Sequence, residues 1–333
     1  MTRNVLVTGA AGFMGSWLVD QLVDEGYDVM GVDNLLGGYE RNINQKSKFV
    51  KLDLRDFKAV QDLCKDVDVI YHLAAYAAEG QSVFSPAAIN DINVTPMNNL
   101  LVAAINNNVR RFVFTSSMAV YGAQTPPFDE TMERRPEDPY GVGKAYCEQM
   151  LEIFGRTYGL EYTVLRPHNV YGPRQNIYDP YRNVLGIWMN RIMRKLPPMI
   201  YGDGEQTRAF SYVNDIISCI IKAGFADAAN KQTINIGSDE VVSVNEACDL
   251  IMDITGARFK PTYIEERPNE VKHAYCTVQK SIDILQYKTK YRLKDGLREM
   301  YSWAKKVGPQ EPTYTLPLEI TKNAPTVWVK KTM

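Results

Sequence analysis

Short apolar runs alternate with longer amphipathic stretches through the first half of the chain. Runs of five to seven residues are typical of strands, and apolar residues that recur every three or four positions are typical of helices. We expect strands at residues 4–8, 28–33, 48–53, 68–74, 111–117 and 161–167, and helices that start at Gly12, start at Asp56, extend through Asn107 and span about 138–158. This alternation predicts repeated βαβ units on a parallel sheet, an α/β doubly wound fold.

The pattern loosens beyond Pro173 into loops rich in Pro, Asn and Tyr. A helix near 183–195 and a strand at 233–237 are still expected, and the tail 309–331 reads as extended, with Trp328 packed on the protein surface. We therefore expect residues 1–175 to form the sheet domain, with 210–240 returning to it. Residues 176–333 should form a smaller C-terminal lobe and the tail.

Composition excludes several classes of protein. The 333 residues are 45% hydrophobic, and 38 basic against 39 acidic residues give a net charge of -1, so no overall field favours nucleic acid or a membrane surface. The apolar run from Ile216 is broken by Lys222 and Asp227, and the first residues lack the features of a signal peptide. A cytoplasmic protein is the expectation.

Cysteine and histidine residues do not suggest a metal or disulfide framework. The five cysteines lack CxxC spacing, and His72, His168 and His273 lie far apart in the chain. His72 is expected to fix a strand end rather than to act in catalysis. The sequence predicts no metal site.

The segment TGAAGFMG lies between the first strand and the first helix. Gly9, Gly12 and Gly15 let the chain turn tightly and approach a pyrophosphate at the helix N-terminus. Asp33 ends the second strand, 24 positions after Gly9, near the offset expected for an acid on the adenosine ribose. The spacing predicts a dinucleotide site.

Asp33 also indicates which dinucleotide is bound. A carboxylate accepts both ribose hydroxyls but repels a 2′-phosphate, and no Arg or Lys follows until Arg41. NAD is therefore favoured over NADP. Asp53, at the end of the third strand, is placed either to accept from the adenine amino group or to cap a helix.

Tyr140 and Lys144 are four residues apart on a predicted helix and so share one face. A phenol has an ordinary pKa of about 10, and a nearby ammonium stabilises its phenolate. Such a pair can remove a proton from a hydroxyl while a hydride leaves the same carbon. Ser117, one strand earlier, completes the candidate catalytic group.

At this point the chain resembles the extended short-chain dehydrogenase/reductase family, in its nucleotide-sugar epimerase and dehydratase branch. The resemblance covers residues 4 to about 300 and rests on motifs in family order: TGAAGFMG, the DN pair at 33–34, HLAA, TSSMAVYG, YGVGK, LRPHNVYGPRQN, YGDGEQTRAFSYV, INIGS and RPNEVKHAY. It implies a Rossmann-type sheet with a smaller substrate-binding lobe, tightly bound NAD, and a homodimer formed through two helices of the sheet domain.

The resemblance also implies roles for individual residues. Ser117, Tyr140 and Lys144 match the catalytic group, Lys144 would also hold the nicotinamide ribose, and Asn169, Arg208 and Arg267 match positions that bind the nucleotide diphosphate. Glu79 is a further expected substrate contact. The expected cofactor contacts are Gly9, Gly12, Phe13, Met14, Gly15, Asp33, Asn34, Asp53, Leu54, Leu73, Ala74, Ala75, Tyr140 and Lys144.

The residues after Ser117 favour one reaction within the branch. Dehydratases of the branch resemble one another in carrying Asp-Glu there, whereas this chain has Met118 and Ala119, which cannot exchange a proton with a leaving hydroxyl. Decarboxylases are disfavoured by the lack of Glu at Ala119. The reaction that is left is epimerisation, in which the sugar is oxidised to a bound 4-keto intermediate and then reduced on its other face.

Other departures from the family bear on the sugar. In the loop 74–86, Tyr76, Glu79 and Gln81 do not match UDP-galactose 4-epimerases, and Ala209 replaces an Asp that often follows the phosphate arginine, which would loosen that arginine. Asn176 stands where relatives acting on uronic acids tend to carry Arg. A neutral UDP-hexose, interconverted between UDP-glucose and UDP-galactose, is the expected substrate. N-acetylhexosamine, uronic acid and GDP-sugar substrates remain alternatives, as does a non-catalytic NAD sensor.

Overall fold

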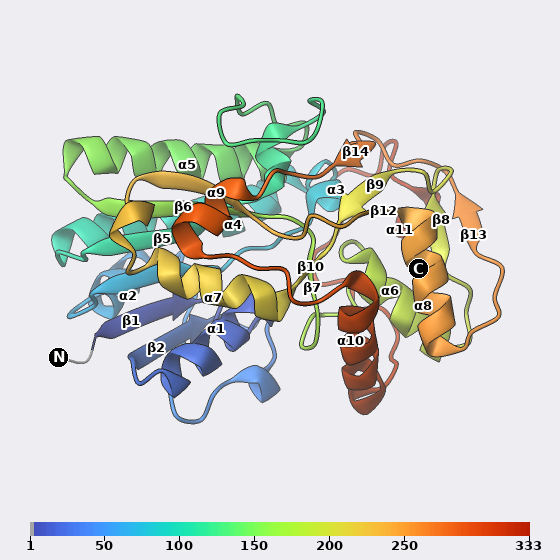
Figure 1. Cartoon of the computed structure of the whole chain (residues 1–333), viewed down its shortest axis with the longest axis horizontal. Coiled ribbons are helices and arrows are strands. Elements are labelled where there is room, and N and C mark those ends of the chain that lie inside the picture. Colours follow the sequence, from blue (N-terminus) through green and yellow to red (C-terminus); the bar gives the residue numbers. More distant parts are fainter. Residues whose placement is uncertain (1–2) are drawn as a thin grey trace.

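The computed structural model describes residues 3–333. Its main element is a seven-stranded sheet in the order β11-β6-β5-β4-β1-β2-β3, in which every neighbouring pair is parallel (Figure 1). The strands are β1 Asn4–Thr8, β2 Asp28–Asp33, β3 Lys48–Lys51, β4 Val69–His72, β5 Arg111–Thr115, β6 Glu161–Pro167 and β11 Gln232–Ile236. The prediction of a doubly wound α/β sheet is confirmed. Strand order reverses at β1, which opens a crevice at the carboxyl ends of the strands there.

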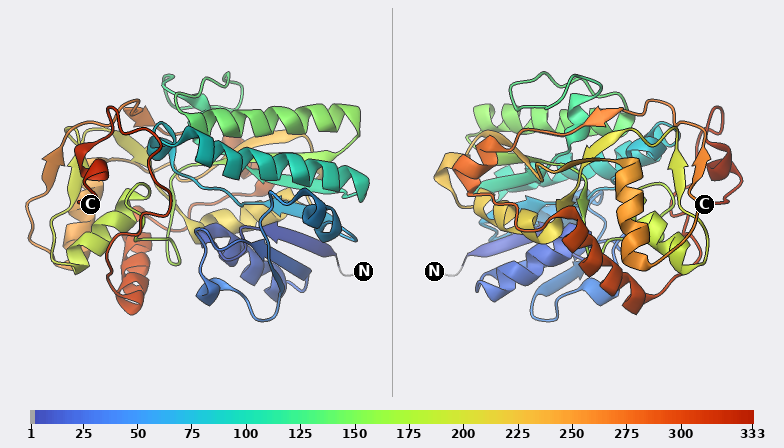
Figure 2. Two further views of the ribbon diagram at one scale, coloured as in Figure 1. Left: turned by 180° about the vertical axis from the view of Figure 1, so that it is seen from behind. Right: turned by 45° about the vertical axis from the view of Figure 1, so that its right-hand side comes forward.

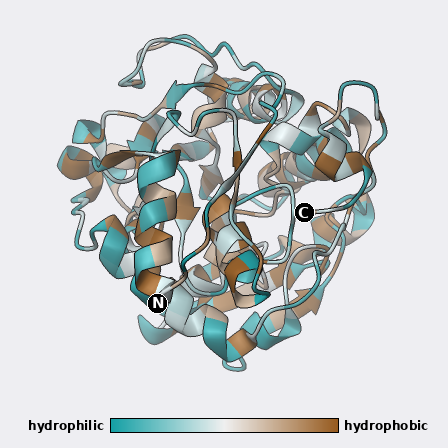
Figure 3. Ribbon diagram, turned by 90° about the vertical axis from the view of Figure 1, so that its right-hand side faces the viewer, coloured by the Kyte–Doolittle hydropathy of each residue, from teal (hydrophilic) through white to brown (hydrophobic). Residues whose placement is uncertain are grey.

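Helices cover both faces of this sheet because its strands alternate their apolar side chains. Val5 and Val7 pack into the core on the side of helices α1 and α7, whereas Leu6 packs on the other side. The helices of the first face are α1 Phe13–Asp24 and α7 Val213–Ala223, and those of the second are α2 Phe57–Leu63, α4 Pro86–Asn106 and α5 Pro139–Thr157. Figure 3 shows hydrophilic and hydrophobic residues side by side along the outer helices, as expected for amphipathic helices.

A smaller lobe lies beyond the carboxyl edge of the sheet (Figure 2). Its helices are α6 Val184–Met193, α8 Val244–Thr255 and α10 Leu293–Val307. Its short strands pair as β7 Val170–Tyr171 with β10 Ser211–Tyr212, β8 Met199–Tyr201 with β13 Thr262–Ile264, and β9 Thr207–Ala209 with both β12 Val241–Ser243 and β14 His273–Ala274. Within the stretch 210–240, α7 packs against α1, and β11 pairs with β6 at the edge of the main sheet.

The remaining elements are short. They are α3 Glu79–Ser82, α9 Gln279–Leu285, α11 Thr326–Val329 and the 3-10 turns η1 Glu40–Asn42, η2 Met118–Tyr121 and η3 Asp227–Ala229. None of the helices within residues 3–333 is long and apolar enough to cross a bilayer.

The C-terminal tail differs from its prediction. It is irregular from Gly308 to Pro325, but α11 then forms a helical turn, and Trp328 is buried against Phe84 and Tyr181 instead of lying on the surface. The Glu319 carboxylate accepts hydrogen bonds from the first backbone N–H groups of α4, at 3.0 and 2.9 Å. The tail is therefore part of the packed structure around the loop 74–86.

Candidate active site

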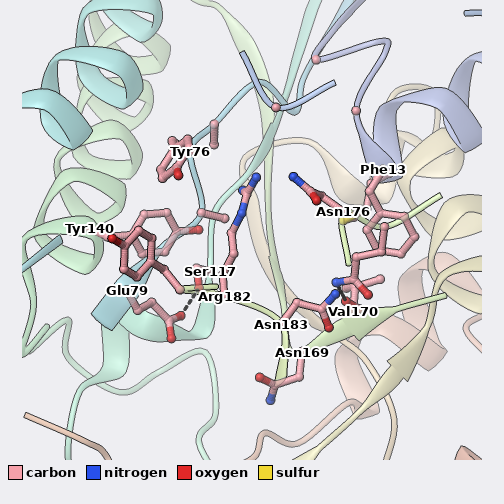
Figure 4. A pocket seen from close by; sticks show the side chains of 18 of the residues that line it. Phe13, Tyr76, Glu79, Ser117, Tyr140, Asn169, Val170, Asn176, Arg182 and Asn183 are labelled. Carbon is pink, nitrogen blue, oxygen red and sulfur yellow. Dashed lines mark hydrogen bonds between the residues drawn. The ribbon is translucent and has the colours of Figure 1, made fainter. Parts of the chain in front are cut away.

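One cavity of about 480 Å³ lies at the carboxyl edge of the sheet and extends into the smaller lobe. The glycine turn, Asp33 and Asn34 line one end, and Arg208, Arg267 and Glu270 line the other. Ser117, Tyr140 and Lys144 also line it, and Figure 4 shows Ser117 and Tyr140 close together beside Glu79. All the residues expected to bind cofactor or substrate line this one cavity, so segments far apart in the chain meet there. The individual roles of these residues stay predictions.

The glycine turn forms a narrow cradle before α1. Gly9 has φ of +73°, a conformation that favours glycine, and a Cβ there would lie 2.9 Å from the Ala74 backbone nitrogen. A Cβ on Gly15 would collide with the Gly9 carbonyl oxygen. The backbone N–H groups at the start of α1 therefore stay open to the cavity. This arrangement fits the pyrophosphate of a dinucleotide.

Asp33 is held at the adenosine end by the backbone. The N–H groups of Ala11 and Leu35 donate to its two carboxylate oxygens at 3.0 and 2.7 Å. Burial raises the pKa of Asp33, while these backbone hydrogen bonds oppose that rise. The fixed acceptor beside the glycine turn fits the two hydroxyls of a ribose.

Asp53 has partners of its own. Arg55 donates to both of its oxygens, at 3.0 and 2.7 Å, and Asn34 donates at 3.2 Å. The Arg55 hydrogen bond lowers the pKa of Asp53. Asp53 does not cap α2, since Asp56 accepts from the Ala59 N–H at 3.0 Å and performs that role. The helix-cap alternative for Asp53 is therefore wrong.

Ser117, Tyr140 and Lys144 come from the end of β5 and the first turns of α5. Asp138 caps α5 by accepting from the Gly141 N–H at 2.9 Å. The Lys144 ammonium donates to the Thr115 carbonyl at 2.8 Å and lies 5.7 Å from the centre of the Tyr140 ring. Burial raises the pKa of Tyr140 and lowers that of Lys144 to about 8. Burial makes both the Tyr140 phenolate and the Lys144 ammonium unfavourable on their own. Because their charges are opposite, each of these two forms stabilises the other.

Glu79 reaches the same point from another element, as Figure 4 shows. Its Oε1 accepts from the Ser117 hydroxyl at 3.5 Å. Glu79 lines the cavity and is exposed to it. Desolvation, followed by the charge of Asp138, raises the pKa of Glu79 to about 7. Met118 and Ala119 bring no acid next to Ser117 in the chain, but the fold places the Glu79 carboxyl beside the Ser117 hydroxyl.

The two arginines at the far end of the cavity share one carboxylate. Arg208 donates to Glu270 Oε1 at 2.8 Å and to the Thr207 carbonyl at 2.8 Å, and Arg267 donates to Glu270 Oε2 at 2.6 Å. Arg208 is thus well oriented, and the expectation that Ala209 loosens it is wrong. Sequence reasoning missed Glu270, whose i, i+3 spacing from Arg267 was the available signal.

Asn169 and the loop 74–86 complete the walls. Asn169 adopts φ of +43° and donates to the Ala209 carbonyl at 3.1 Å. Gln81 is buried and donates to the Leu316 carbonyl at 3.0 Å, so it ties the loop to the tail. Tyr76 is buried and points its hydroxyl at Asp179. Of the three unusual residues of this loop, Glu79 is the one whose charge faces the catalytic group.

Sequence reasoning also missed Arg182 and Trp328, which both line the cavity. Arg182 lies six residues beyond Asn176 in the chain, and its side chain points into the cavity (Figure 4). Asn176 itself brings no cation to the cavity, but the fold places that of Arg182 in the same lining. In the described part of the chain, none of the three histidines lines this cavity. His72 instead bonds Thr8 at 2.8 Å, at a strand end.

Comparisons with known proteins agree with this geometry. Residues 5–237 match the protein family described as "NAD dependent epimerase/dehydratase family". A "putative UDP-glucose 4-epimerase" of Methanocaldococcus jannaschii is 38% identical, over 90% of this chain and 98% of its own length.

Two solved structures are similar over the whole fold. The UDP-glucose 4-epimerase of Thermotoga maritima with UDP-glucose is 35% identical, with a TM-score of 0.87 over 91% of this chain and 99% of that one. A UDP-N-acetylglucosamine 4-epimerase of Methanobrevibacter ruminantium is also 35% identical, with a TM-score of 0.85 over 91% and 98%.

Proposed function

This chain belongs to the NAD-dependent epimerase/dehydratase family as a nucleotide-sugar epimerase that uses NAD, and we propose that it interconverts UDP-glucose and UDP-galactose at carbon 4. The observation that carries this proposal is the convergence of Ser117, Tyr140 and Lys144 on one cavity, between the glycine turn and the Arg208–Arg267 pair. That order matches a dinucleotide at one end, a reacting sugar in the middle and a diphosphate at the other end.

On this proposal, NAD held by the glycine turn and Asp33 would supply the hydride acceptor and donor for carbon 4 of the sugar, which is reduced again on its other face. Tyr140 takes the proton of the carbon 4 hydroxyl, and Ser117 holds that oxygen. The Lys144 ammonium, 5.7 Å from the Tyr140 ring, stabilises the phenolate. Because the hydride returns to the sugar, turnover leaves no net change in the cofactor.

The far end of the cavity supports a UDP group. Arg208 and Arg267 present two cations on one carboxylate, so a diphosphate that enters there meets a net positive charge and forked donors. We assign diphosphate binding to these two arginines and to Asn169. The named relatives above act on UDP-sugars, which supports uridine as the nucleoside.

Glu79 supports a neutral hexose over a uronic acid. A carboxylate beside Ser117 repels a second carboxylate on the sugar, whereas it can accept from a sugar hydroxyl. The N-acetylhexosamine pair is the second candidate. It is supported by the 35% identity to a UDP-N-acetylglucosamine 4-epimerase.

Product analysis tests the proposal. The protein is incubated with UDP-glucose, UDP-N-acetylglucosamine, UDP-glucuronic acid and GDP-mannose in turn, and products are separated by chromatography and weighed. We expect UDP-galactose from UDP-glucose. Turnover of only the uronic acid or the GDP-sugar would refute the substrate, and a product lighter by one water would refute epimerisation.

Two matched variants test the catalytic assignment. Tyr140→Phe should lower turnover by about 10²-fold or more while NAD binding is kept, because only the proton-accepting oxygen is lost. Tyr158→Phe is the control, since Tyr158 lies at the C-terminal end of the same helix, is 59% exposed and does not line the cavity. Near-normal turnover of the Tyr140 variant would remove this residue from the mechanism.

We also propose a homodimer formed through α4 and α5. Val142, Tyr146 and Ile153 lie along one face of α5 and are exposed by 52%, 39% and 36%. An apolar stripe of this kind is typical of a helix that packs against a partner. Light scattering on the purified protein should give the mass of two chains, and Val142→Glu should give that of one. A monomeric wild-type protein would refute the dimer.

A further inference from the structure

Arg182 extends from the smaller lobe into the cavity, between Tyr76 on one side and Asn176 on the other (Figure 4). It stands just before α6, and its side chain is 21% exposed. Its Nε donates to Asp179 Oδ2 at 3.0 Å, and its guanidinium carbon lies 4.7 Å from the centre of the Tyr76 ring. Two separate contacts therefore fix the direction of this cation.

The two partners of Arg182, Asp179 and Tyr76, are themselves held in place. The Asp179 side chain is fully buried and also accepts from the Tyr76 hydroxyl at 3.3 Å and from the Tyr181 N–H at 2.9 Å. The outer nitrogens of Arg182, Nη1 and Nη2, make no hydrogen bond with any residue from 3 to 333. Neither nitrogen is sealed from the cavity. The guanidinium is thus oriented through Nε, and the N–H donors of Nη1 and Nη2 remain available.

The free edge faces the loop that covers the start of α1. A Cβ placed on Gly37 would lie 3.2 Å from Arg182 Nη2. The next residue, Gly38, packs directly on Ala11, and the Tyr39 N–H donates to the Ala11 carbonyl at 2.9 Å. Arg182 therefore lies beside the loop that packs on the glycine turn.

The other cations that line the cavity already have partners in the protein. Arg55 is paired with Asp53 and Asp91, Lys144 donates to the Thr115 carbonyl, and Arg208 and Arg267 share Glu270. Arg182 is the arginine in this lining that keeps both outer nitrogens uncommitted among the described residues. Arg182 is also paired, through Nε with Asp179, but its two outer nitrogens remain available as donors to an anion near the glycine turn.

We propose that Arg182 binds the pyrophosphate of NAD from the side of the smaller lobe, opposite the N-terminus of α1. The pyrophosphate carries two negative charges, and the helix N-terminus supplies backbone donors on one side only. A fork of two N–H groups matches phosphate oxygens on the other side. Release of NAD should then be slow, because Arg182 lies beside both Tyr76 in the loop 74–86 and Gly37 in the loop that packs on the glycine turn. The inference does not depend on which sugar reacts.

NAD exchange tests this role without an activity measurement. The purified holoprotein is loaded with labelled NAD and chased with unlabelled NAD, and release is followed by rapid filtration. Arg182→Met should release NAD on the order of 10- to 100-fold faster, as expected for loss of a charge-assisted contact to phosphate. Arg182→Lys should release NAD at a rate between those of the wild type and Arg182→Met, because it keeps the positive charge but loses the pair of parallel N–H donors.

Arg194→Met is the matched control. Arg194 lies at the end of α6, paired with Glu311, and does not line the cavity. It should release NAD at the wild-type rate. Wild-type release from Arg182→Met would overturn the inference, as would equally fast release from the control. If Arg182→Met does not fold, the Lys variant decides, and unchanged release from it would overturn the inference. Weakened binding of a UDP-sugar with unchanged NAD release would assign Arg182 to the sugar instead.

Discussion

Removal of Glu148 should destabilise the protein and disturb its catalytic group together. This residue of α5 is 1% exposed and accepts from Arg166 Nε and Nη2 at 2.9 and 2.6 Å. It also accepts from the Ser116 hydroxyl at 2.6 Å. One buried carboxylate thus joins the helix of Tyr140 to β6 and to the strand end that carries Ser117.

The size of the effect follows from the burial of the pair. Glu148→Leu leaves the Arg166 cation buried without its partner, which costs about 3–5 kcal/mol. Unfolding entropy near 60 °C is about 2.1 cal/mol/K per residue, which for this chain length gives about 0.7 kcal/mol/K. The expected fall in Tm is therefore about 4–7 °C. Turnover should fall as well, because the anchor beside Ser117 is lost.

Calorimetry at saturating NAD and neutral pH measures this change. Glu152→Leu is the control on the same helix, since Glu152 is 35% exposed and its partner Arg134 is also solvent-accessible, so its removal should cost at most about 1 kcal/mol. Glu148→Leu combined with Arg166→Leu should recover part of the Tm. A Glu148→Leu protein that melts with the wild type, or a double variant that melts below the single one, would refute the reasoning.

At the cofactor end, Asp33→Asn should bring the affinities for NAD and NADP closer together, from a wild-type preference for NAD of about tenfold or more, as measured by titration with both. Equal wild-type affinities would contradict the role of Asp33. Gly15→Ala should abolish NAD binding in the same assay, because its methyl would collide with the Gly9 carbonyl. The pKa of Glu79 is about 7 in the folded protein, above its ordinary 4.5. The free energy of unfolding of the protein therefore falls as the pH rises through this range. Glu79→Gln should therefore melt above the wild type at pH 8, with the gap closing at pH 5. Glu137→Gln is the control, because Glu137 does not line the cavity, and it should show no such gap. A gap in Glu79→Gln that is equal at both pH values would contradict the assignment.

Much of the sheet domain could be predicted because its strands are defined by local pattern. The strands at 4–8, 28–33 and 161–167 have the predicted bounds, and α5 begins and ends one residue inside the predicted 138–158. The strands predicted at 48–53, 68–74 and 111–117 each end two residues early, because the last two residues of each run line the cavity instead. The strand predicted at 233–237 ends one residue early. The small strands β7 to β10 were missed since two or three residues carry no period of their own.

The site was predictable where its chemistry depends on spacing within one element. The glycine turn, Asp33 and the pair Tyr140 and Lys144 are of this kind. Glu270 and Arg182 were missed because their importance depends on which segments the fold brings together. Arg182 in particular needs Asp179, Tyr76 and Gly37 around it, and no spacing along the chain connects these three.

The position of Glu79 changes what distinguishes epimerisation from elimination in this site. An acid is present, so the reaction is not decided by the absence of one after Ser117. What matters is the atom that the acid reaches. On the proposed assignment, Ser117 holds the oxygen of the carbon that is oxidised, and Glu79 accepts a hydrogen bond from the Ser117 hydroxyl at 3.5 Å. Glu79 therefore acts through Ser117 beside the oxidised carbon, where Tyr140 takes the proton, whereas loss of water needs an acid beside a neighbouring carbon. Glu79→Gln should accordingly lower the rate of epimerisation and shift its pH dependence without producing a dehydrated sugar. A dehydrated product from the wild type that disappears in Glu79→Gln would reverse this conclusion.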